Sequence, residues 1–236
     1  MPHKDAPYDL RSILSATVFG ALGEDALEFV APQAMVERYE LPTLLHRAGT
    51  PLARLRLVVE GHIALTVCHP SGKEVVVSDV SAGGWATWIP CLTPAVPEHD
   101  FYSGPNSVYI ALPTTRVREA CERFPALYPL VLADVGKRVR LLMAWTGQSV
   151  LLQPEQRMAL LIGLLAKDQR LEGNGGAIQV TQHRLAALAR CSRQSANVLL
   201  SALEKKGLIR LAYGKCDIPD LARLHAFAQA EQEGDG

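Results

Sequence analysis

Four polar residues in the C-terminal part of the chain have the types and spacing needed to hydrogen-bond with DNA bases. They share one side of a helix predicted to follow Ser192, and they are Arg193, Gln194, Asn197 and Ser201. Arginine pairs well with guanine, while glutamine and asparagine can make two hydrogen bonds to adenine. The other side is apolar at positions i, i+3, i+4 and i+7, which are Ala196, Leu199, Leu200 and Leu203. This division predicts a helix that packs through one side and contacts bases through the other.

Cap and turn residues predict the elements that must position this helix. Thr181 is a good N-cap for a short first helix, Arg190-Cys191 makes the turn, and Ser192 caps the second helix. Gly207 ends the second helix, and two short strands flank Tyr213-Gly214. This order of elements predicts a winged helix-turn-helix over roughly residues 181–217. The other predicted DNA-contacting residues are Thr181, Gln182, Ser192, Ser195 and Lys215, the last in the wing beside a phosphate.

The charge distribution supports this prediction although the formal net charge of the chain is +0. Between Thr181 and Lys215 only Glu204 is acidic. The basic residues of the same stretch are Arg184, Arg190, Arg193, Lys205, Lys206, Arg210 and Lys215. A local basic excess is expected of a surface that faces DNA. A helical hairpin with a basic, solvated side is the simpler alternative.

The region from about residue 41 to 112 predicts a small antiparallel β-roll. Apolar residues alternate over 55–59 and again over 63–67, with Glu60-Gly61 between them. Pro70-Ser71-Gly72 and Ala82-Gly83-Gly84 supply further turns. Short alternating strands separated by Gly and Pro are typical of such a roll.

The pattern becomes helical around Thr114, and a long helix is predicted from Leu130 to about Trp145. Its apolar stripe, Val131, Val135, Val139, Leu142 and possibly Met143, suits either a core helix or a helix that pairs with a twin. A hinge is expected over 147–154, and Pro154 opens a helix that runs to Asp168. The predicted domains are 1–147, with a dimerisation helix at about 125–147, and 148–236.

Composition favours an ordered protein of the cytoplasm. Apolar residues make up 48% and charged residues 20% of the chain, without an uninterrupted apolar run of membrane-spanning length. Residues 1–5 lack the features of a signal peptide. The cysteines at 68, 91, 121, 191 and 216 are scattered and do not form a C-x-x-C pair, which argues against a zinc ribbon and against disulfides.

The segment 180–213 resembles the catabolite activator/fumarate-nitrate regulator (CRP/FNR) family. The resemblance is carried by Cys-Ser-Arg-Gln-Ser-Ala-Asn over 191–197 and Leu-Glu-Lys-Lys-Gly-Leu-Ile over 203–209. It extends to His46-x-x-Gly49, to Glu60-Gly-His-Ile and to the helix after Pro125, but it is poor before residue 40. It implies an α+β fold: an N-terminal cyclic-nucleotide-binding-like β-roll, a long dimerisation helix and a C-terminal winged helix-turn-helix. It also implies a homodimer on a pseudo-palindromic double-stranded DNA site, with RNA polymerase as a partner.

The chain departs from the family pattern at three positions near the base-contacting helix. It has Gln194 where many members carry Glu, Val198 where they carry Arg, and Arg190 where Gly is frequent in the turn. The target sequence therefore need not be the half-site familiar in that family.

The effector expected at the β-roll is not a cyclic nucleotide. The stretch that matches the phosphate-binding segment is 83–92, and no Arg lies between Gly84 and Val108 to pair with a phosphate. An apolar or aromatic small molecule could instead enter a cavity lined by Trp85, Thr87, Trp88, Leu142 and Met143. A filled core is the alternative, and both the effector and any cofactor stay unknown.

Two other options of the same family and one enzyme class are alternatives to this prediction. A haem-dependent gas-sensing regulator of the same family resembles the chain at Met1-Pro2 and over 218–224, with Cys91 as the nearest candidate ligand. The clustered N-terminal cysteines of iron–sulfur members are absent, since the first cysteine is Cys68. A cupin-like enzyme would need a His-x-His motif, and the histidines at 46, 62, 69 and 99 are isolated, so we expect a protein that is not an enzyme.

Overall fold

The structure is a computed structural model that describes residues 8–68, 71, 74–169, 171 and 173–230. The chain divides into two compact units, residues 1–138 and 139–236. We describe each unit by itself. The domain boundary predicted at 147/148 stays a prediction, because one helix runs through both positions. Within the described residues, none of the helices combines the length and apolarity that a membrane crossing requires.

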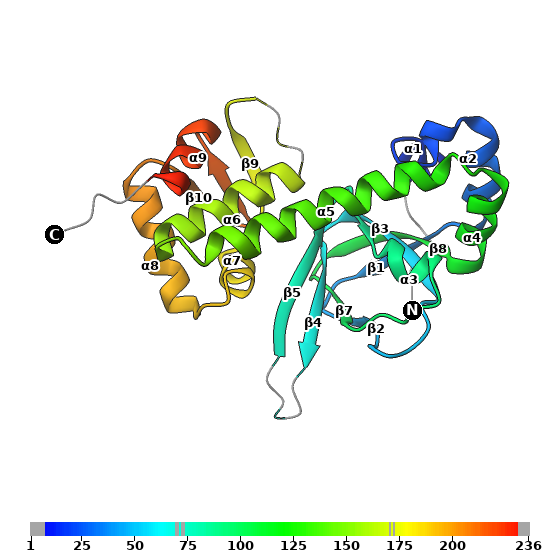
Figure 1. Cartoon of the computed structure of the whole chain (residues 1–236), viewed down its shortest axis with the longest axis horizontal. Coiled ribbons are helices and arrows are strands. Elements are labelled where there is room, and N and C mark those ends of the chain that lie inside the picture. Colours follow the sequence, from blue (N-terminus) through cyan, green and yellow to red (C-terminus); the bar gives the residue numbers. More distant parts are fainter. Residues whose placement is uncertain (1–7, 69–70, 72–73, 170, 172, 231–236) are drawn as a thin grey trace. The chain divides into compact units, whose positions relative to one another are not determined.

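The first unit contains two four-stranded antiparallel sheets (Figure 1). One sheet has the strand order β1 (Met35–Tyr39), β8 (Ser107–Pro113), β3 (Arg54–Glu60) and β6 (Trp85–Ala86). The other has the order β2 (Leu44–His46), β7 (Asp100–Ser103), β4 (His62–Cys68) and β5 (Glu74–Ser81). The predicted β-roll is therefore confirmed, although the prediction began at residue 41 and missed β1.

The chain turns between β3 and β4 at Gly61, as the sequence predicted. Gly61 has a φ of 77°, and a Cβ built there would lie 2.0 Å from Ser107 Oγ, so this position needs glycine. The pairing of β3 with β8 sets Leu55 opposite Leu112 and Leu57 opposite Ile110. These four side chains are buried in the core of the unit.

Short helices accompany the sheets of the first unit. They are α1 (Leu10–Ser15), η1 (Gly20–Leu22), α2 (Glu24–Val30), η2 (Ala31–Gln33), α3 (Trp88–Leu92) and α4 (Thr114–Arg123). Asp9 caps α1 by accepting hydrogen bonds from the backbone N–H groups of Arg11 and Ser12. Leu14, Phe19 and Leu27 from this N-terminal part are buried in the same core as the strands.

The long helix α5 spans Leu127–Ser149 and extends the predicted helix at both ends. The predicted stripe is partly wrong, because Val131 is buried in the core of the first unit and Val135 packs against it. The apolar residues that α5 leaves exposed include Leu132, Val139 and Met143. The predicted hinge begins too early, since Gly147 is helical; a single glycine costs about 1 kcal/mol in a helix, which neighbouring turns can tolerate.

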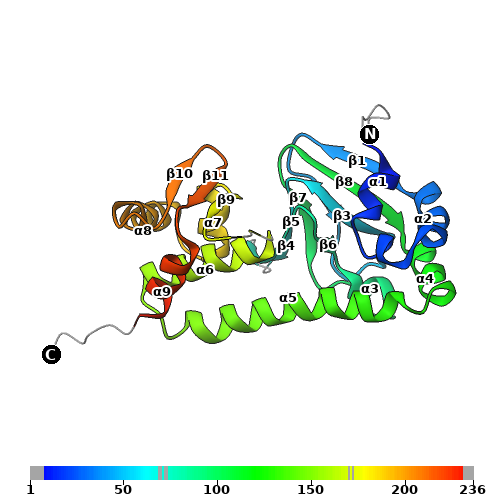
Figure 2. The same cartoon turned by 90° about the horizontal axis from the view of Figure 1, so that it is seen from above.

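The second unit combines the end of α5 and further helices with a three-stranded sheet, seen from another side in Figure 2. The helices that follow α5 are α6 (Pro154–Asp168), α7 (Gln182–Leu188), α8 (Arg193–Lys205) and α9 (Leu221–Gln229). The antiparallel sheet has the order β10 (Arg210–Ala212), β11 (Lys215–Ile218) and β9 (Gly176–Gln179). Its core includes Met158, Ile162, Ile178, Leu200 and Ile209. The structure confirms the predicted helix 154–168 and the predicted winged helix-turn-helix.

Candidate functional site

Helices α7 and α8 begin at the two caps that the sequence predicted. The Thr181 side chain accepts a hydrogen bond from Arg184 N at 3.1 Å, and Ser192 Oγ accepts one from Ser195 N at 3.0 Å. Between the helices, Arg190 has a φ of 53°, which is in the left-handed region. This conformation costs an L-residue roughly 1–2 kcal/mol, which explains why glycine suits the turn. The turn therefore stores strain that the packing of the two helices must offset.

Helix α8 separates its side chains as the sequence predicted. Ala196, Leu200 and Leu203 are fully buried in the core of the second unit. Every predicted DNA-contacting residue is exposed at the surface; these are Thr181, Gln182, Ser192, Arg193, Gln194, Ser195, Asn197, Ser201 and Lys215. Val198 is also exposed and lies next to Asn197 on this side. The exposed side thus carries one cation, two amides and one apolar side chain that can meet base edges.

A Schellman motif ends α8 and leads into the wing. Gly207, with a φ of 68°, donates to Glu204 O, and Leu208 N donates to Leu203 O at 3.0 Å. Glu204 Oε1 accepts a hydrogen bond from Leu211 N in β10 at 2.8 Å. The recognition helix and the wing are therefore connected by hydrogen bonds of both backbone and side chain.

The wing is the hairpin formed by β10 and β11. Ala212 pairs with Lys215, and Tyr213-Gly214 forms the two-residue connection between them. Tyr213 is fully exposed at the tip. Sequence reasoning did not propose Tyr213 as a contact, although an aromatic residue beside glycine in a predicted wing tip was a usable signal.

The predicted basic surface is smaller than the sequence suggested. Arg184 is buried, and its Nη1 donates to Gln179 O at 3.4 Å. Lys206 pairs with Glu155 Oε2 at 2.8 Å, and its Nζ lies over the ring of Phe227. Arg184 is thereby removed from the surface, whereas Lys206 stays exposed in its ion pair. The exposed basic side chains of the stretch 181–215 are Arg190, Arg193, Lys205, Lys206, Arg210 and Lys215.

One exposed residue of α7 contacts the recognition helix and was not predicted as a site residue. Arg193 Nε donates a hydrogen bond to His183 Nδ1 at 3.1 Å. The two residues are ten positions apart, on different helices, so sequence spacing alone gave no signal for this contact.

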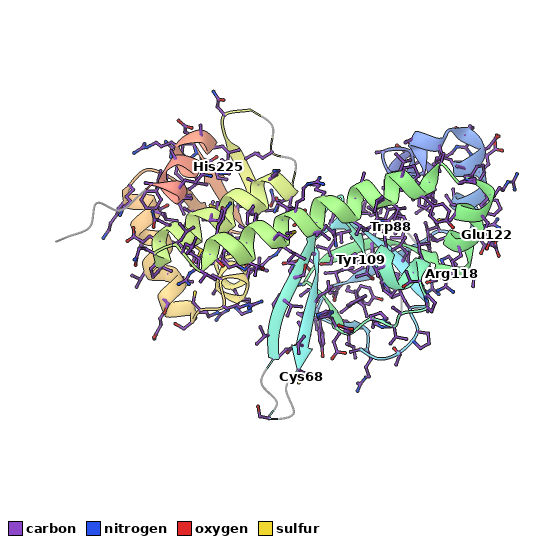
Figure 3. All side chains as sticks on the ribbon, in the orientation of Figure 1. Cys68, Trp88, Tyr109, Arg118, Glu122 and His225 are labelled. Atoms are coloured by element: carbon purple, nitrogen blue, oxygen red, sulfur yellow. The ribbon has the colours of Figure 1, made fainter. Side chains whose placement is uncertain are left out.

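Two residues of the predicted effector pocket form part of a closed aromatic cluster in the first unit. The ring centroids of Trp85 and Trp88 are 5.2 Å apart, and Phe19 meets Trp85 edge-on at 5.6 Å. All three side chains are buried. Trp88 Nε1 donates to Asp134 Oδ2 in α5 at 3.1 Å, and Figure 3 shows Trp88 beside this helix. The two tryptophans therefore fill core space.

The other three predicted pocket residues are divided between the two units, and their grouping with the tryptophans stays a prediction. Leu142 and Met143 are exposed on the part of α5 that belongs to the second unit. Thr87 has a φ of 68°, and its buried Oγ1 makes no hydrogen bond within the described part of the chain.

The surroundings of Cys91 do not fit the haem alternative. The thiol is fully buried in the core of the first unit, and burial raises its pKa to about 12. A haem held by this sulfur would need open space where core side chains are packed. Residues 1–2 lie outside the described residues. Among the described residues, no group of three or more His, Cys, Asp or Glu side chains could hold a metal ion.

Comparisons with known proteins agree with this geometry. The Crp-like helix-turn-helix domain matches residues 156–227. The cAMP-activated global transcriptional regulator CRP of Escherichia coli O6:H1 is 21% identical over 195 residues, which cover 81% of this chain and 92% of that protein.

Two solved structures share the fold. FixK2 from Bradyrhizobium japonicum superposes with a TM-score of 0.70 at 12% identity, covering 84% of this chain and 98% of the other. A CooA variant from Carboxydothermus hydrogenoformans superposes with a TM-score of 0.66 at 18% identity, covering 95% of this chain and 97% of the other. The β-roll, the long helix and the winged helix-turn-helix thus occur here in the order found in these regulators. Residues 156–227 thus match a Crp-like helix-turn-helix domain, and the chain is similar in sequence and fold to DNA-binding regulators of the CRP type.

Proposed function

We propose that this protein binds promoter DNA by placing α8 in the major groove. The observation that carries the proposal is the division of α8 into a buried apolar side and an exposed polar side. Arg193, Gln194, Asn197 and Ser201 face base edges, whose pattern of donors and acceptors differs between base pairs in this groove. Thr181, Gln182, Ser192, Ser195 and Lys215 contact the phosphate backbone, and this set fixes the position of the helix.

Regulators of the CRP/FNR family bind DNA as dimers and are not enzymes, which agrees with the prediction of a non-enzymatic regulator. We infer that this chain forms a homodimer on a pseudo-palindromic site. The exposed residues Leu132, Val139 and Met143 share one side of α5 at spacings of seven and four, and pairing with a second copy would bury them. Two recognition helices would then contact half-sites about 34 Å apart.

The signal and the transcription machinery complete the proposal. RNA polymerase is the partner through which a DNA-bound regulator changes transcription. An unidentified small molecule at the β-roll is the proposed signal. Because no arginine lies between residues 84 and 108 to pair with a phosphodiester, we expect cyclic AMP to bind neither measurably nor with an effect on DNA affinity. Micromolar binding of cyclic AMP by calorimetry would contradict this part.

The DNA-binding proposal is tested by Arg193→Ala. Selection from random duplexes first supplies a specific site. The variant is expected to lose about 1–3 kcal/mol of specific binding at each half-site, with an unchanged circular dichroism spectrum because Arg193 is exposed. Gln229→Ala, an exposed change in α9, is the control that leaves binding unchanged. Sequence-specific affinity retained by Arg193→Ala in a mobility-shift titration would refute the assignment of α8.

A further inference from the structure

The contact between His183 and Arg193 joins the two helices of the helix-turn-helix at their exposed N-terminal ends. His183 is the second residue of α7, whose first turn is fixed by the Thr181 cap. Arg193 is the first residue of α8, whose first turn is fixed by the Ser192 cap. Because both backbones are anchored, the 3.1 Å hydrogen bond from Arg193 Nε to His183 Nδ1 restricts the arginine side chain rather than the helices.

This bond determines which donors of Arg193 stay available. A guanidinium carries five N–H donors in a planar fork. With Nε occupied by the imidazole, the terminal Nη1 and Nη2 groups remain as a pair that can point away from the protein. That pair matches the O6 and N7 acceptors of guanine. A free arginine would instead sample many rotamers and could also present Nε to a phosphate.

The bond also defines the state of the imidazole. A ring nitrogen that accepts a hydrogen bond carries no proton, so neutral His183 has its proton on Nε2. His183 therefore acts on Arg193 as a hydrogen-bond acceptor, through the lone pair of Nδ1.

We propose that His183 is a positioning residue that orients Arg193 for end-on recognition of guanine. The inference rests on the proposed function of α8. It adds that His183 of α7 holds the Arg193 side chain in the orientation that pairs with guanine. It predicts that the base pair facing Arg193 is G·C and that its preference depends on an acceptor at position 183. Specificity at that base pair therefore depends on both helices.

The test is a double-mutant cycle measured on the selected DNA site and on the same site with its G·C pair replaced by A·T. His183→Ala is expected to weaken binding to the G·C site about three- to tenfold, the range for one hydrogen bond, and to have less effect on the A·T site. In the Arg193→Ala background the same change should have no further effect. His183→Gln, which supplies a carbonyl acceptor, should restore most of the preference.

Three outcomes would overturn the proposal. His183→Ala could leave the G·C preference intact, or weaken both sites equally, or add to the effect of Arg193→Ala; the last two would show that His183 contacts phosphate by itself. If the alanine variant lost its circular dichroism signal, His183→Leu would take its place. Leucine also lacks a hydrogen-bond acceptor, so it can be compared with His183→Gln in the same way. Failure of the proposed function is distinguishable, because Arg193→Ala would then keep its sequence preference whatever stands at position 183.

Discussion

Helix α8 in the second unit and helix α3 in the first use their side chains in opposite ways. Both follow closely on a residue with a positive φ, Arg190 at 53° and Thr87 at 68°. Helix α8 has a side-chain cap and leaves its polar residues exposed, whereas α3 has no side-chain cap and buries Trp88. A polar side chain that keeps its water can exchange it for a DNA base, while a buried indole is already committed to packing.

This difference separates a binding surface from a supporting core. Exposed donors such as Arg193 contribute little to folding and remain available to a partner. Trp88 contributes through its contacts with Trp85 and Phe19 and through its hydrogen bond to Asp134. Substitutions in α8 should therefore change recognition, and substitutions in α3 should change stability.

Trp88→Ala is the sharpest way to test the supporting role of α3. Removing a large buried aromatic side chain is expected to lower the free energy of unfolding by about 3–5 kcal/mol. Urea denaturation followed by tryptophan fluorescence measures this change in the unfolding transition of the first unit. Gln194→Ala in α8 is the counterpart and should stay within about 0.5 kcal/mol of wild type. Equal stability of the two variants would contradict the comparison.

Leu132→Glu combined with Val139→Glu tests whether the exposed side of α5 is the dimer surface. Placing two carboxylates on each copy should produce a monomer in sedimentation. Specific DNA binding should fall by about 2–5 kcal/mol, which is half of the 4–10 kcal/mol that separates specific from non-specific binding. Ala133→Glu, exposed beside the stripe, is the control. A double variant that remains dimeric would place the dimer surface elsewhere.

Arg190→Gly probes the strained turn before α8. Glycine removes the strain of the left-handed conformation, but it also gives the unfolded chain more conformational freedom, which offsets part of the gain. The net effect should be an unfolding free energy higher by about 0.5–1 kcal/mol. Arg190→Ala keeps the strain and should show no such gain. Thermal unfolding of both variants decides the matter; a less stable glycine variant would mean that the arginine side chain supports the turn.

The smallest expected effect concerns pH and the first unit. Burial, followed by the nearby Arg56, lowers the pKa of His46, so the folded protein favours the neutral ring. This contribution to stability is present above the unfolded value of about 6.5 and is lost as the pH falls. His46→Phe, which keeps a ring against Phe101, should therefore make the unfolding free energy fall less between pH 7 and 5.5. If the unfolding free energy of His46→Phe fell with pH as steeply as that of the wild type, His46 would not contribute to the pH dependence.

The second unit was predictable because its signals are local. The caps Thr181 and Ser192 and the C-terminal Gly207 act on backbone groups within a few residues, and all three behave as predicted. The burial of Arg184 depends on the packing of the folded unit, so a count of basic residues could not exclude it from the surface. The pairing of Lys206 with Glu155 spans 51 positions and gave no local signal either.

The first unit was predictable in its strands but not in the packing of α5 and Trp88. Alternation within β4 and the turn at Gly61 are properties of consecutive residues. Whether Val131 faces its own core or a partner depends on the packing of α5 against the first unit. The hydrogen bond between Trp88 and Asp134 likewise spans 46 positions, so only the folded chain reveals it.

The bond between Glu204 and Leu211 N has a consequence for how this regulator can evolve. Glu204 is the one acidic side chain in the basic stretch 181–215, and it is used as a brace between helix and wing. Because the brace and Gly207 lie at the end of α8, residues in its first two turns can change without disturbing the wing. In the proposed complex with DNA, exchanging Gln194 or Asn197 alone would therefore give access to new target sequences, while the distance from the bases to the phosphate beside the wing would stay constant. An insertion over 206–209, by contrast, would alter that distance for every target at once.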